Sequence, residues 1–296
     1  MKELRGYVMI LGSAVFWGTS ATAAKALFNQ QLDTVLVVQA RVTVSMFLLL
    51  GFYLIFRRDF LRIDPRELWK FALLGCIGVA GTNFTYYFTI KETTVATAIL
   101  IQYTAPLLVM LYAVWSGEER FTGAKIIAVV LSLGGCFLAV GAYDREVLRI
   151  TPLGLLTGIG SIFGFAFLTI FTRSVLKTHG VWTSTFYAML FASLFWGVLN
   201  PPWVVAAQPL TAHTWGALVV LAVVSLLIPQ TLFFGGLRRI VPSRAIITST
   251  FEPIVAIVSA AWYLGELLEG PQILGALLVI AAILLLQAHP EEHYGA

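Results

Sequence analysis

An internal repeat constrains this chain more than any other feature of its sequence. Residues 94–140 and 241–287 align without a gap at an offset of 147 residues, and residue types that match rarely by chance coincide in the two copies. A period this long indicates a duplicated half-protein and not a solenoid repeat. The coinciding pairs are Pro106 and Pro253, Trp115 and Trp262, Glu119 and Glu266, and Gly123 and Gly270.

Composition places both copies in a membrane. Hydrophobic residues make up 59% of the 296 residues and charged residues only 11%, and the mean hydropathy is +0.88. A helix needs roughly 20 mostly apolar residues to cross about 30 Å of hydrocarbon with its backbone hydrogen bonds satisfied. The sequence therefore predicts an all-α polytopic membrane protein. Its ten predicted transmembrane helices lie at residues 6–27, 35–56, 68–90, 94–116, 123–141, 152–172, 181–199, 214–236, 242–264 and 271–288.

The number of spans in each half determines how the two copies cross the bilayer. Each half has five predicted spans, an odd number, so the second copy is expected to cross upside down relative to the first. Lys and Arg concentrate in the loops on the side of the N-terminus, which the positive-inside rule assigns to the cytoplasm. We therefore expect two inverted five-helix repeats, residues 1–147 and 148–296, around a central cavity, with both termini cytoplasmic.

Several classes of function lack a signature in this sequence. The four histidines show no metal-ligand spacing, and neither a Walker loop nor a dinucleotide fingerprint is present. Cys76 and Cys136 both fall inside predicted spans and offer no disulfide framework. The basic residues line alternate loops instead of forming one patch, which argues against nucleic acid as a partner. We expect no enzymatic activity, no cofactor and no bound metal, and a gradient as the source of energy.

A shared polar pattern marks spans 3 and 8 as cavity helices. At the offset of 147, Asn83 aligns with Gln230, and in both copies two aromatic residues follow the amide by three and four positions. These spacings put the amide and both rings on one helical face. An amide that faced lipid would leave its donors and acceptors unpaired, so this face is expected to point inward. The aromatic residues are Tyr86 and Tyr87 in span 3, and Phe233 and Phe234 in span 8.

Four further residues each allow two interpretations. Glu252 lies near the middle of span 9, where an unpaired charge costs about 2.5–3.5 kcal/mol on insertion scales. It is either a functional group, as a proton site or a partner for a substrate amine, or a structural one that bonds helix ends exposed by Pro253. Pro106 and Pro253 lie near the centres of their helices and are expected to act as hinges, although proline also serves packing in spans. Arg41 is expected to extend to the outer surface, with a grip on a substrate carboxylate as the alternative.

Two segments resemble a known family of membrane carriers. Residues 98–106, which run on to Trp-Ser-Gly-Glu-Glu at 115–119, are similar to the span 4 signature of the EamA-like branch of the drug/metabolite transporter superfamily. Residues 249–253 and 262–266 are similar to its span 9 counterpart, and Arg41 and residues 16–18 also fit. The resemblance implies a ten-helix carrier whose central cavity is lined by spans 1, 3, 4, 6, 8 and 9. Within the family, the aromatic-rich pattern is similar to that of YddG-type aromatic amino-acid exporters.

The expected function is that of a secondary transporter that exports small organic solutes across the bacterial inner membrane by alternating access. The expected solutes are amino acids with aromatic or bulky apolar side chains, or related metabolites. A multidrug exporter for cationic drugs is the main alternative, followed by a passive channel and a lipid scramblase. Membrane lipids and the small-molecule substrate are the expected partners of a monomeric protein. The candidate substrate-binding residues are Trp17, Gln39, Asn83, Tyr86, Tyr87, Gln102, Tyr103, Phe163, Phe167, Gln230, Phe233, Thr250 and Glu252.

Overall fold

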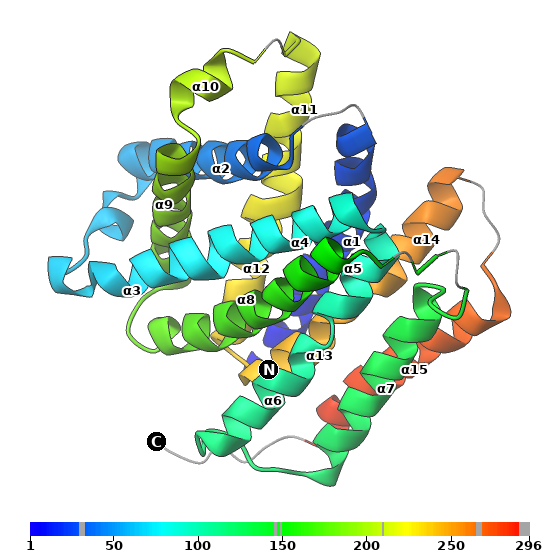
Figure 1. Ribbon diagram of the computed structural model, residues 1–296. Coiled ribbons are helices and arrows are strands. Elements are labelled where there is room, and N and C mark those ends of the chain that lie inside the picture. Colours follow the sequence, from blue (N-terminus) through cyan, green and yellow to red (C-terminus); the bar gives the residue numbers. More distant parts are fainter. Residues whose placement is uncertain (30–32, 145–146, 149, 209, 265–267, 290–296) are drawn as a thin grey trace.

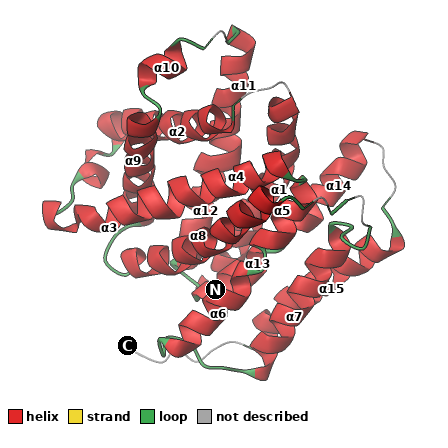
Figure 2. Cartoon of the chain, viewed as in Figure 1, coloured by secondary structure: helices red, strands yellow, loops and turns green. Residues whose placement is uncertain are grey.

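The described chain is built from helices. The structure is a computed structural model that describes residues 1–29, 33–144, 147–148, 150–208, 210–264 and 268–289, and within these ranges there is no β-strand (Figure 1, Figure 2). A lipid environment favours this architecture, because a helix satisfies its backbone N–H and C=O groups within one segment. The predicted all-α class is confirmed for these residues.

The N-terminal half begins with two long helices. These are α1 (Lys2–Asn29) and α2 (Thr34–Phe56), and the Asp33 carboxylate caps α2 by accepting from the backbone nitrogen of Leu36. The elements that follow are the 3₁₀ turns η1 (Arg58–Leu61) and η2 (Pro65–Glu67), α3 (Leu68–Leu73), the π-helix η3 (Leu74–Gly81), α4 (Thr82–Glu92), α5 (Val95–Gln102), α6 (Ala105–Trp115) and α7 (Gly123–Ala139).

The C-terminal half follows a similar order. Two uninterrupted helices, α8 (Pro152–Leu176) and α9 (Val181–Leu199), are followed by the short α10 (Pro202–Ala206). The remaining elements are α11 (Ala212–Ala222), the π-helix η4 (Val223–Leu227), α12 (Ile228–Leu237), α13 (Pro242–Ser249), α14 (Glu252–Leu264) and α15 (Gly270–Ala288).

Seven helical stretches among the described residues are long and apolar enough to cross a membrane by length and composition. The predicted spans at 6–27, 123–141 and 242–264 are outside this group. Of these, α7 has only 17 residues, fewer than a full span requires. The chain is a multi-pass membrane protein.

The helices pack in pairs, several of which join the two halves of the chain (Figure 1). The pairs include α7 with α15, α4 with α8, α1 with α12 and with α14, and α6 with α13. Glycines allow close contact between α7 and α15, because a Cβ atom on Gly275 would lie 2.4 Å from the backbone nitrogen of Ala139 and 2.6 Å from the Gly135 oxygen. Lipid offers no hydrophobic driving force between helices, so such close packing contributes much of their association.

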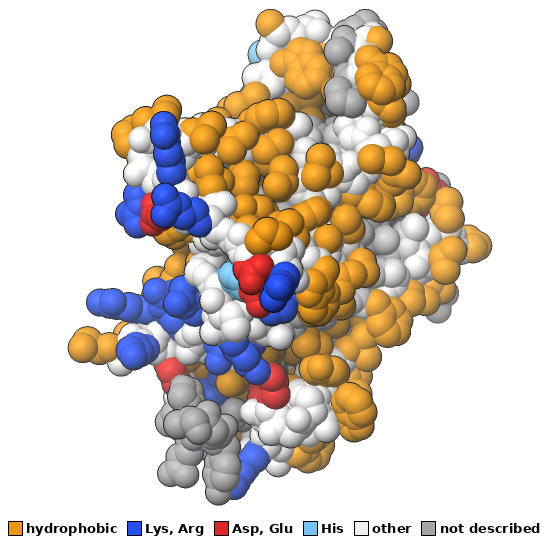
Figure 3. Space-filling view, turned by 90° about the vertical axis from the view of Figure 1, so that its left-hand side faces the viewer, with side chains coloured by type: hydrophobic (Ala, Val, Ile, Leu, Met, Phe, Trp, Pro, Cys, Tyr) orange, Lys and Arg blue, Asp and Glu red, His pale blue; other side chains and the backbone are white. Residues whose placement is uncertain are grey.

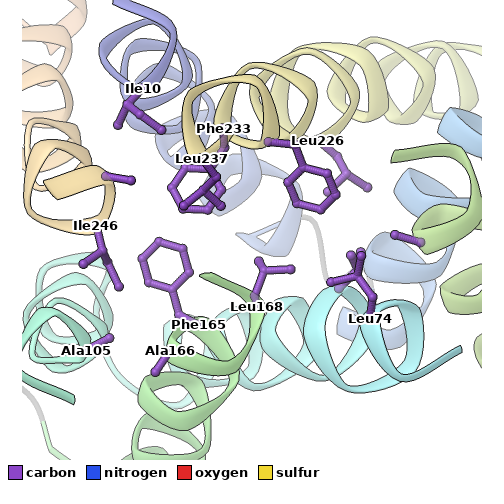
Figure 4. Packing of buried hydrophobic residues seen from close by; sticks show 14 of the residues in the cluster. Ile10, Leu74, Ala105, Phe165, Ala166, Leu168, Leu226, Phe233, Leu237 and Ile246 are labelled. Atoms are coloured by element: carbon purple, nitrogen blue, oxygen red, sulfur yellow. The ribbon is translucent and has the colours of Figure 1, made fainter. Parts of the chain in front are cut away.

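Buried apolar side chains fill the space between α1, α8, α12 and α13. Figure 4 shows Phe165 of α8 and Phe233 of α12 near each other, with Ile10 of α1 and Ile246 of α13 nearby. The two phenylalanine rings are stacked, with their centroids 5.7 Å apart. Dispersion contacts between such rings stabilise the position of α8 relative to α12, and both helices contribute to the cavity described below.

Two of the predicted spans are interrupted at equivalent positions. A turn at residues 103–104 separates α5 from α6, and a turn at residues 250–251 separates α13 from α14. These turns lie 147 residues apart, the offset of the sequence repeat. Irregular backbone at membrane depth is tolerated where it is buried in protein or lines a cavity. The breaks therefore indicate where a cavity is to be sought.

The two repeat-related prolines lie directly after these breaks. Pro106 and Pro253 are each the second residue of the following helix, α6 or α14. Proline is tolerated there because a first-turn N–H has no intrahelical partner to lose. Each of these two predicted spans is therefore divided into two helices, and the first of the two ends before the proline. The role of both prolines as hinges stays a prediction.

Candidate substrate-binding site

A cavity lies where the two interrupted stretches meet α1, α2, α4, α8 and α12. It contains about 550 Å³ of space free of protein atoms. Polar and aromatic side chains dominate its lining, which is unusual at membrane depth and marks a functional candidate. The lining residues are Trp17, Ser20, Arg41, Thr82, Asn83, Tyr86, Tyr87, Gln102, Tyr103, Phe165, Leu168, Gln230 and Glu252.

Glu252 is the acidic residue of this lining and is 7% exposed. It is the first residue of α14, where the helix dipole favours a negative charge. The hydroxyl of Tyr103 lies 2.7 Å from Oε2 and 2.9 Å from the Ser249 carbonyl oxygen, and the hydroxyl of Tyr86 lies 3.5 Å from Oε1. Among the described residues Glu252 forms no ion pair. Two phenols therefore hold a buried carboxylate that lacks a counter-ion in this part of the chain.

Arg41 of α2 is the basic residue of the lining and is 2% exposed. Its Nη2 donates to the carbonyl oxygen of Ser225 in η4 at 2.8 Å, and Nη1 lies 3.5 Å from Asn83 Oδ1. The guanidinium carbon is 4.4 Å from the centroid of the Tyr87 ring, a cation–π arrangement. The expectation that Arg41 reaches the outer surface is wrong, because these contacts hold it at the cavity. It too forms no ion pair within the described ranges.

Three buried polar atoms in the lining have no hydrogen-bond partner among the residues that the structure describes. They are Nε of Arg41, Oγ1 of Thr82 and Nε2 of Gln230. Buried polar groups in proteins are nearly always bonded, and an unsatisfied one costs about 1–3 kcal/mol. The two nitrogen atoms are donors, and the Thr82 hydroxyl can donate as well. The cavity therefore offers unused donors to an acceptor-bearing molecule that enters it.

Aromatic side chains connect the two charged groups of the cavity. Tyr86 contacts Glu252 and Tyr87 contacts Arg41, and the two tyrosine rings meet edge to face with centroids 5.6 Å apart. Trp17 and Phe165 add a second edge-to-face pair with centroids 6.2 Å apart. The site thus presents a cation and an anion on a largely aromatic surface.

The structure brings together most of the predicted substrate-binding residues at this cavity. Their polar members come from both halves of the chain, as the sequence repeat predicts. The predicted residues that line the cavity are Trp17, Asn83, Tyr86, Tyr87, Gln102, Tyr103, Gln230 and Glu252.

Three other predicted residues lie outside the lining and have structural contacts. Gln39 and Asn200 bind each other, since Gln39 Nε2 donates to the Asn200 carbonyl oxygen and Asn200 Nδ2 donates to Gln39 Oε1, both at 2.7 Å. The Thr250 hydroxyl donates to the Ile247 carbonyl oxygen at 2.6 Å. Phe233 is fully buried against Trp17 with ring centroids 5.3 Å apart, so it supports the lining from behind.

Two predicted residues of α8 also lie outside the cavity lining. Phe163 is 61% exposed and is not in the cavity lining. Phe167 stacks on Phe171, with ring centroids 5.0 Å apart, and also lies outside the lining. The reason is helical geometry: each lies two positions from Phe165, a rotation of about 200° around the helix axis.

Five lining residues were missed as sites by sequence reasoning. Phe165 could have been found, because at the offset of 148 that relates span 1 to span 6 it aligns with Trp17. Arg41 was predicted to extend to the outer surface, because it lies early in its span. Ser20, Thr82 and Leu168 had no signal that distinguishes them from packing residues. In the described part of the chain, no group of three His, Cys, Asp or Glu side chains could hold a metal ion.

A multi-pass helical protein with a buried polar cavity at its helix breaks has the structure of a membrane transporter. The chain belongs to the EamA-like transporter family, whose model matches it twice, over residues 4–141 and 152–287. The resemblance found in the sequence is therefore confirmed at the level of the family.

Individual relatives cover nearly the whole chain. An uncharacterized transporter of Archaeoglobus fulgidus is 29% identical over 95% of both chains. The threonine/homoserine exporter RhtA of Salmonella typhimurium is 28% identical over 89% of this chain and 85% of its own. A solved crystal structure with 17% identity superposes over 95% of both chains with a TM-score of 0.76, which shows a shared fold. Neither of the two named relatives is described as an aromatic amino-acid exporter.

Proposed function

We propose that this protein is a secondary transporter that exports amino acids or related small zwitterions across the bacterial inner membrane by alternating access. The observation that carries the proposal is the pair of buried, oppositely charged side chains, Arg41 and Glu252, at one aromatic cavity with unused donors. Burying such charges is costly unless a partner offsets their desolvation, and a zwitterionic solute supplies both partners at once.

The proposed binding mode assigns each end of the solute to one side of the cavity. The carboxylate accepts from Arg41, with Thr82 and Gln230 as further donors, because all three have an unpaired atom. The ammonium group donates to Glu252, whose oxygens otherwise accept from tyrosine hydroxyls. The side chain lies against the aromatic lining, which favours a bulky or aromatic group. The name of the relative RhtA, a threonine/homoserine exporter, supports amino acids as the class.

The proposed architecture has ten spans in two inverted repeats, residues 1–147 and 148–296, with both termini in the cytoplasm. Three features support it: the two matches of one family model, the two helix breaks at one offset, and the π-helices η3 and η4 before Asn83 and Gln230. π-helical turns occur often at functional sites. Rocking of one repeat against the other would expose the cavity to each side in turn, with Pro106 and Pro253 beside the hinges. An inner membrane location is supported by the name of the relative YicL, an inner membrane transporter.

Counterflow in reconstituted vesicles tests the proposal. Vesicles loaded with unlabelled threonine, homoserine, phenylalanine or tryptophan are diluted into a trace of the same labelled amino acid. A carrier accumulates label transiently and saturates with concentration, whereas a channel or a scramblase does neither. Absence of counterflow for every amino acid in the panel would exclude amino-acid transport.

A second candidate is the export of cationic drugs. Glu252 favours it, because a buried carboxylate beside Tyr86 and Tyr103 can bind an organic cation without any help from Arg41. Counterflow separates the two functions: a labelled quaternary ammonium compound should exchange far more slowly than the amino acids if the zwitterion is the preferred substrate, because it cannot use Arg41.

A further inference from the structure

A second cavity lies apart from the first and shares none of its lining residues. It is formed where α1, η1, the start of α9 and the end of α12 meet, and it contains about 700 Å³ of space free of protein atoms. Its lining combines apolar and aromatic side chains with two adjacent arginines. These residues are Met9, Phe60, Val181, Trp182, Arg238 and Arg239.

No carboxylate in the described part of the chain neutralises the charges of the two arginines. Arg239 uses Nη1 to donate to the Gly235 carbonyl oxygen at 2.7 Å, and neither arginine forms an ion pair with a described carboxylate. Arg238 is exposed, and its Nη1 would lie 4.0 Å from a Cβ atom on Gly180. A third cation is close, since the Arg57 guanidinium carbon is 4.6 Å from the centroid of the Phe60 ring, although Arg57 also pairs with the Asp59 carboxylate at 3.5 Å. The cavity thus lies in a region of positive potential.

The surroundings of the cavity match the boundary between membrane and water. Figure 3 shows one face of the molecule, where Lys and Arg side chains gather on one side and hydrophobic side chains cover much of the rest. Trp182 is 46% exposed, and tryptophan is enriched at the level of lipid headgroups. A soluble anion would use only the arginines, whereas the apolar part of the lining suits an acyl chain. Arginine is also the side chain best suited to bind phosphate through two parallel hydrogen bonds.

We propose that this cavity binds one anionic phospholipid. The headgroup phosphate accepts from Arg238 and Arg239, and the first carbons of an acyl chain lie against Met9, Phe60 and Trp182. Basic pockets between helices at the membrane surface bind anionic headgroups through the same chemistry. The inference does not depend on the proposed transport function.

Native mass spectrometry of the full chain tests the proposal with equimolar phosphatidylglycerol and phosphatidylcholine. The wild-type protein should retain one molecule of phosphatidylglycerol in preference to phosphatidylcholine. The double variant Arg238→Gln and Arg239→Gln should lose roughly 25-fold in that preference, since each basic side chain near an anionic headgroup contributes roughly fivefold. The double variant Arg238→Lys and Arg239→Lys keeps the charge and should keep most of the preference.

A matched control removes two charges from the same end of the molecule. Arg62 and Arg66 are exposed and do not line the cavity, so Arg62→Gln with Arg66→Gln should leave the preference unchanged. Thermal unfolding in detergent establishes that each variant is folded before lipids are compared. An equal loss in the control, or equal retention of both lipids by the wild type, would overturn the site. Displacement of the lipid by millimolar glycerol phosphate would show a site for soluble phosphates and overturn the lipid assignment.

Discussion

Two buried charge sites in this protein are built in opposite ways. In the first, the Lys125 ammonium lies 2.7 Å from Glu119 Oε2, and the two side chains are only 2% and 1% exposed. Glu119 also accepts from the backbone nitrogen of Ser243 at 3.2 Å and from its hydroxyl, so it joins the connection after α6 to the start of α13. In the second site, Arg41 and Glu252 are as deeply buried, but within the described residues neither has a counter-ion.

The difference separates a structural role from a binding role. A buried ion pair offsets the desolvation of its charges internally, so the Lys125–Glu119 site is complete without a ligand. In the cavity site, Arg41 and Glu252 contact only neutral groups, and some hydrogen-bond donors have no acceptor. This arrangement lowers stability but leaves these groups able to bind a solute. We therefore expect the loss of a charge at the first site to lower stability and the loss of a charge at the second to lower transport.

The largest expected effect follows from neutralising the structural pair. Glu119→Gln keeps the shape of the side chain but leaves Lys125 buried without its anion, and breaking such a pair costs about 3–5 kcal/mol. Unfolding of the purified protein in detergent measures the loss. The neighbouring Glu118→Gln is the control, because its pair with Lys177 is exposed and contributes at most about 1 kcal/mol. Similar losses of unfolding free energy in Glu119→Gln and Glu118→Gln would show that the buried pair contributes no more than the exposed one.

Neutralising the cavity charges should instead affect transport. Arg41→Gln and Glu252→Gln each remove one charge-assisted contact to the solute, worth about 1.5–3 kcal/mol, which corresponds to roughly a 10- to 150-fold loss of amino-acid counterflow. The free energy of unfolding should change less than in Glu119→Gln, because glutamine still forms hydrogen bonds at both positions. Counterflow of an amino acid and of a permanent organic cation is measured for each variant. Arg41→Gln should spare the cation, and an equal loss for both solutes would contradict the assigned roles.

The helical architecture was predictable because its signal is distributed over long apolar segments. The breaks were not, since the turns at residues 103–104 and 250–251 use Tyr, Thr and Phe, residue types that occur equally well inside membrane helices. The only local signals were Pro106 and Pro253, and they suggest a kink at the proline. The chain instead ends the helix upstream and places each proline in the first turn of the next one, where it fits without strain.

The candidate site was predictable where a periodic pattern fixed the helical face. Asn83, Tyr86 and Tyr87 define such a face, and all three line the cavity. Residues 152–172 of α8 contain no amide or charged side chain that would fix the face, and the predicted Phe163 and Phe167 lie on the side away from Phe165. Arg41 could not be placed, because its depth in the span does not determine the direction of its side chain. Its hydrogen bond to a carbonyl oxygen of the π-helix η4 depends on the packing of two distant segments.

A loss of stability is expected at the two tyrosines that hold Glu252. Tyr103→Phe removes the hydroxyl 2.7 Å from Oε2 and should cost about 1.5–3 kcal/mol in unfolding free energy. Tyr86→Phe should cost clearly less, because at 3.5 Å its contact with Oε1 is at the limit of a hydrogen bond. Thermal unfolding of both variants measures the difference. A larger loss for Tyr86→Phe would show that Tyr103 is not the main support of the carboxylate.

The smallest expected effect lies at the other end of the α7–α15 pair, far from the buried ion pair. The hydroxyl of Tyr143, which follows α7, donates to the carboxylate of Glu269 before α15. This hydrogen bond raises the pKa of Tyr143 to about 12, because it favours the neutral phenol beside a carboxylate. The stabilisation is therefore complete below the unfolded tyrosine pKa of about 10 and is lost as the pH rises through 12.

Tyr143→Phe should lower the unfolding free energy at pH 7 by less than about 1 kcal/mol, since solvent screens this exposed link. The variant should also lose the decline in stability between pH 10 and 12 relative to the wild type. A loss as large as that of Glu119→Gln would mean that exposed and buried links between the halves contribute equally, against the contrast drawn above.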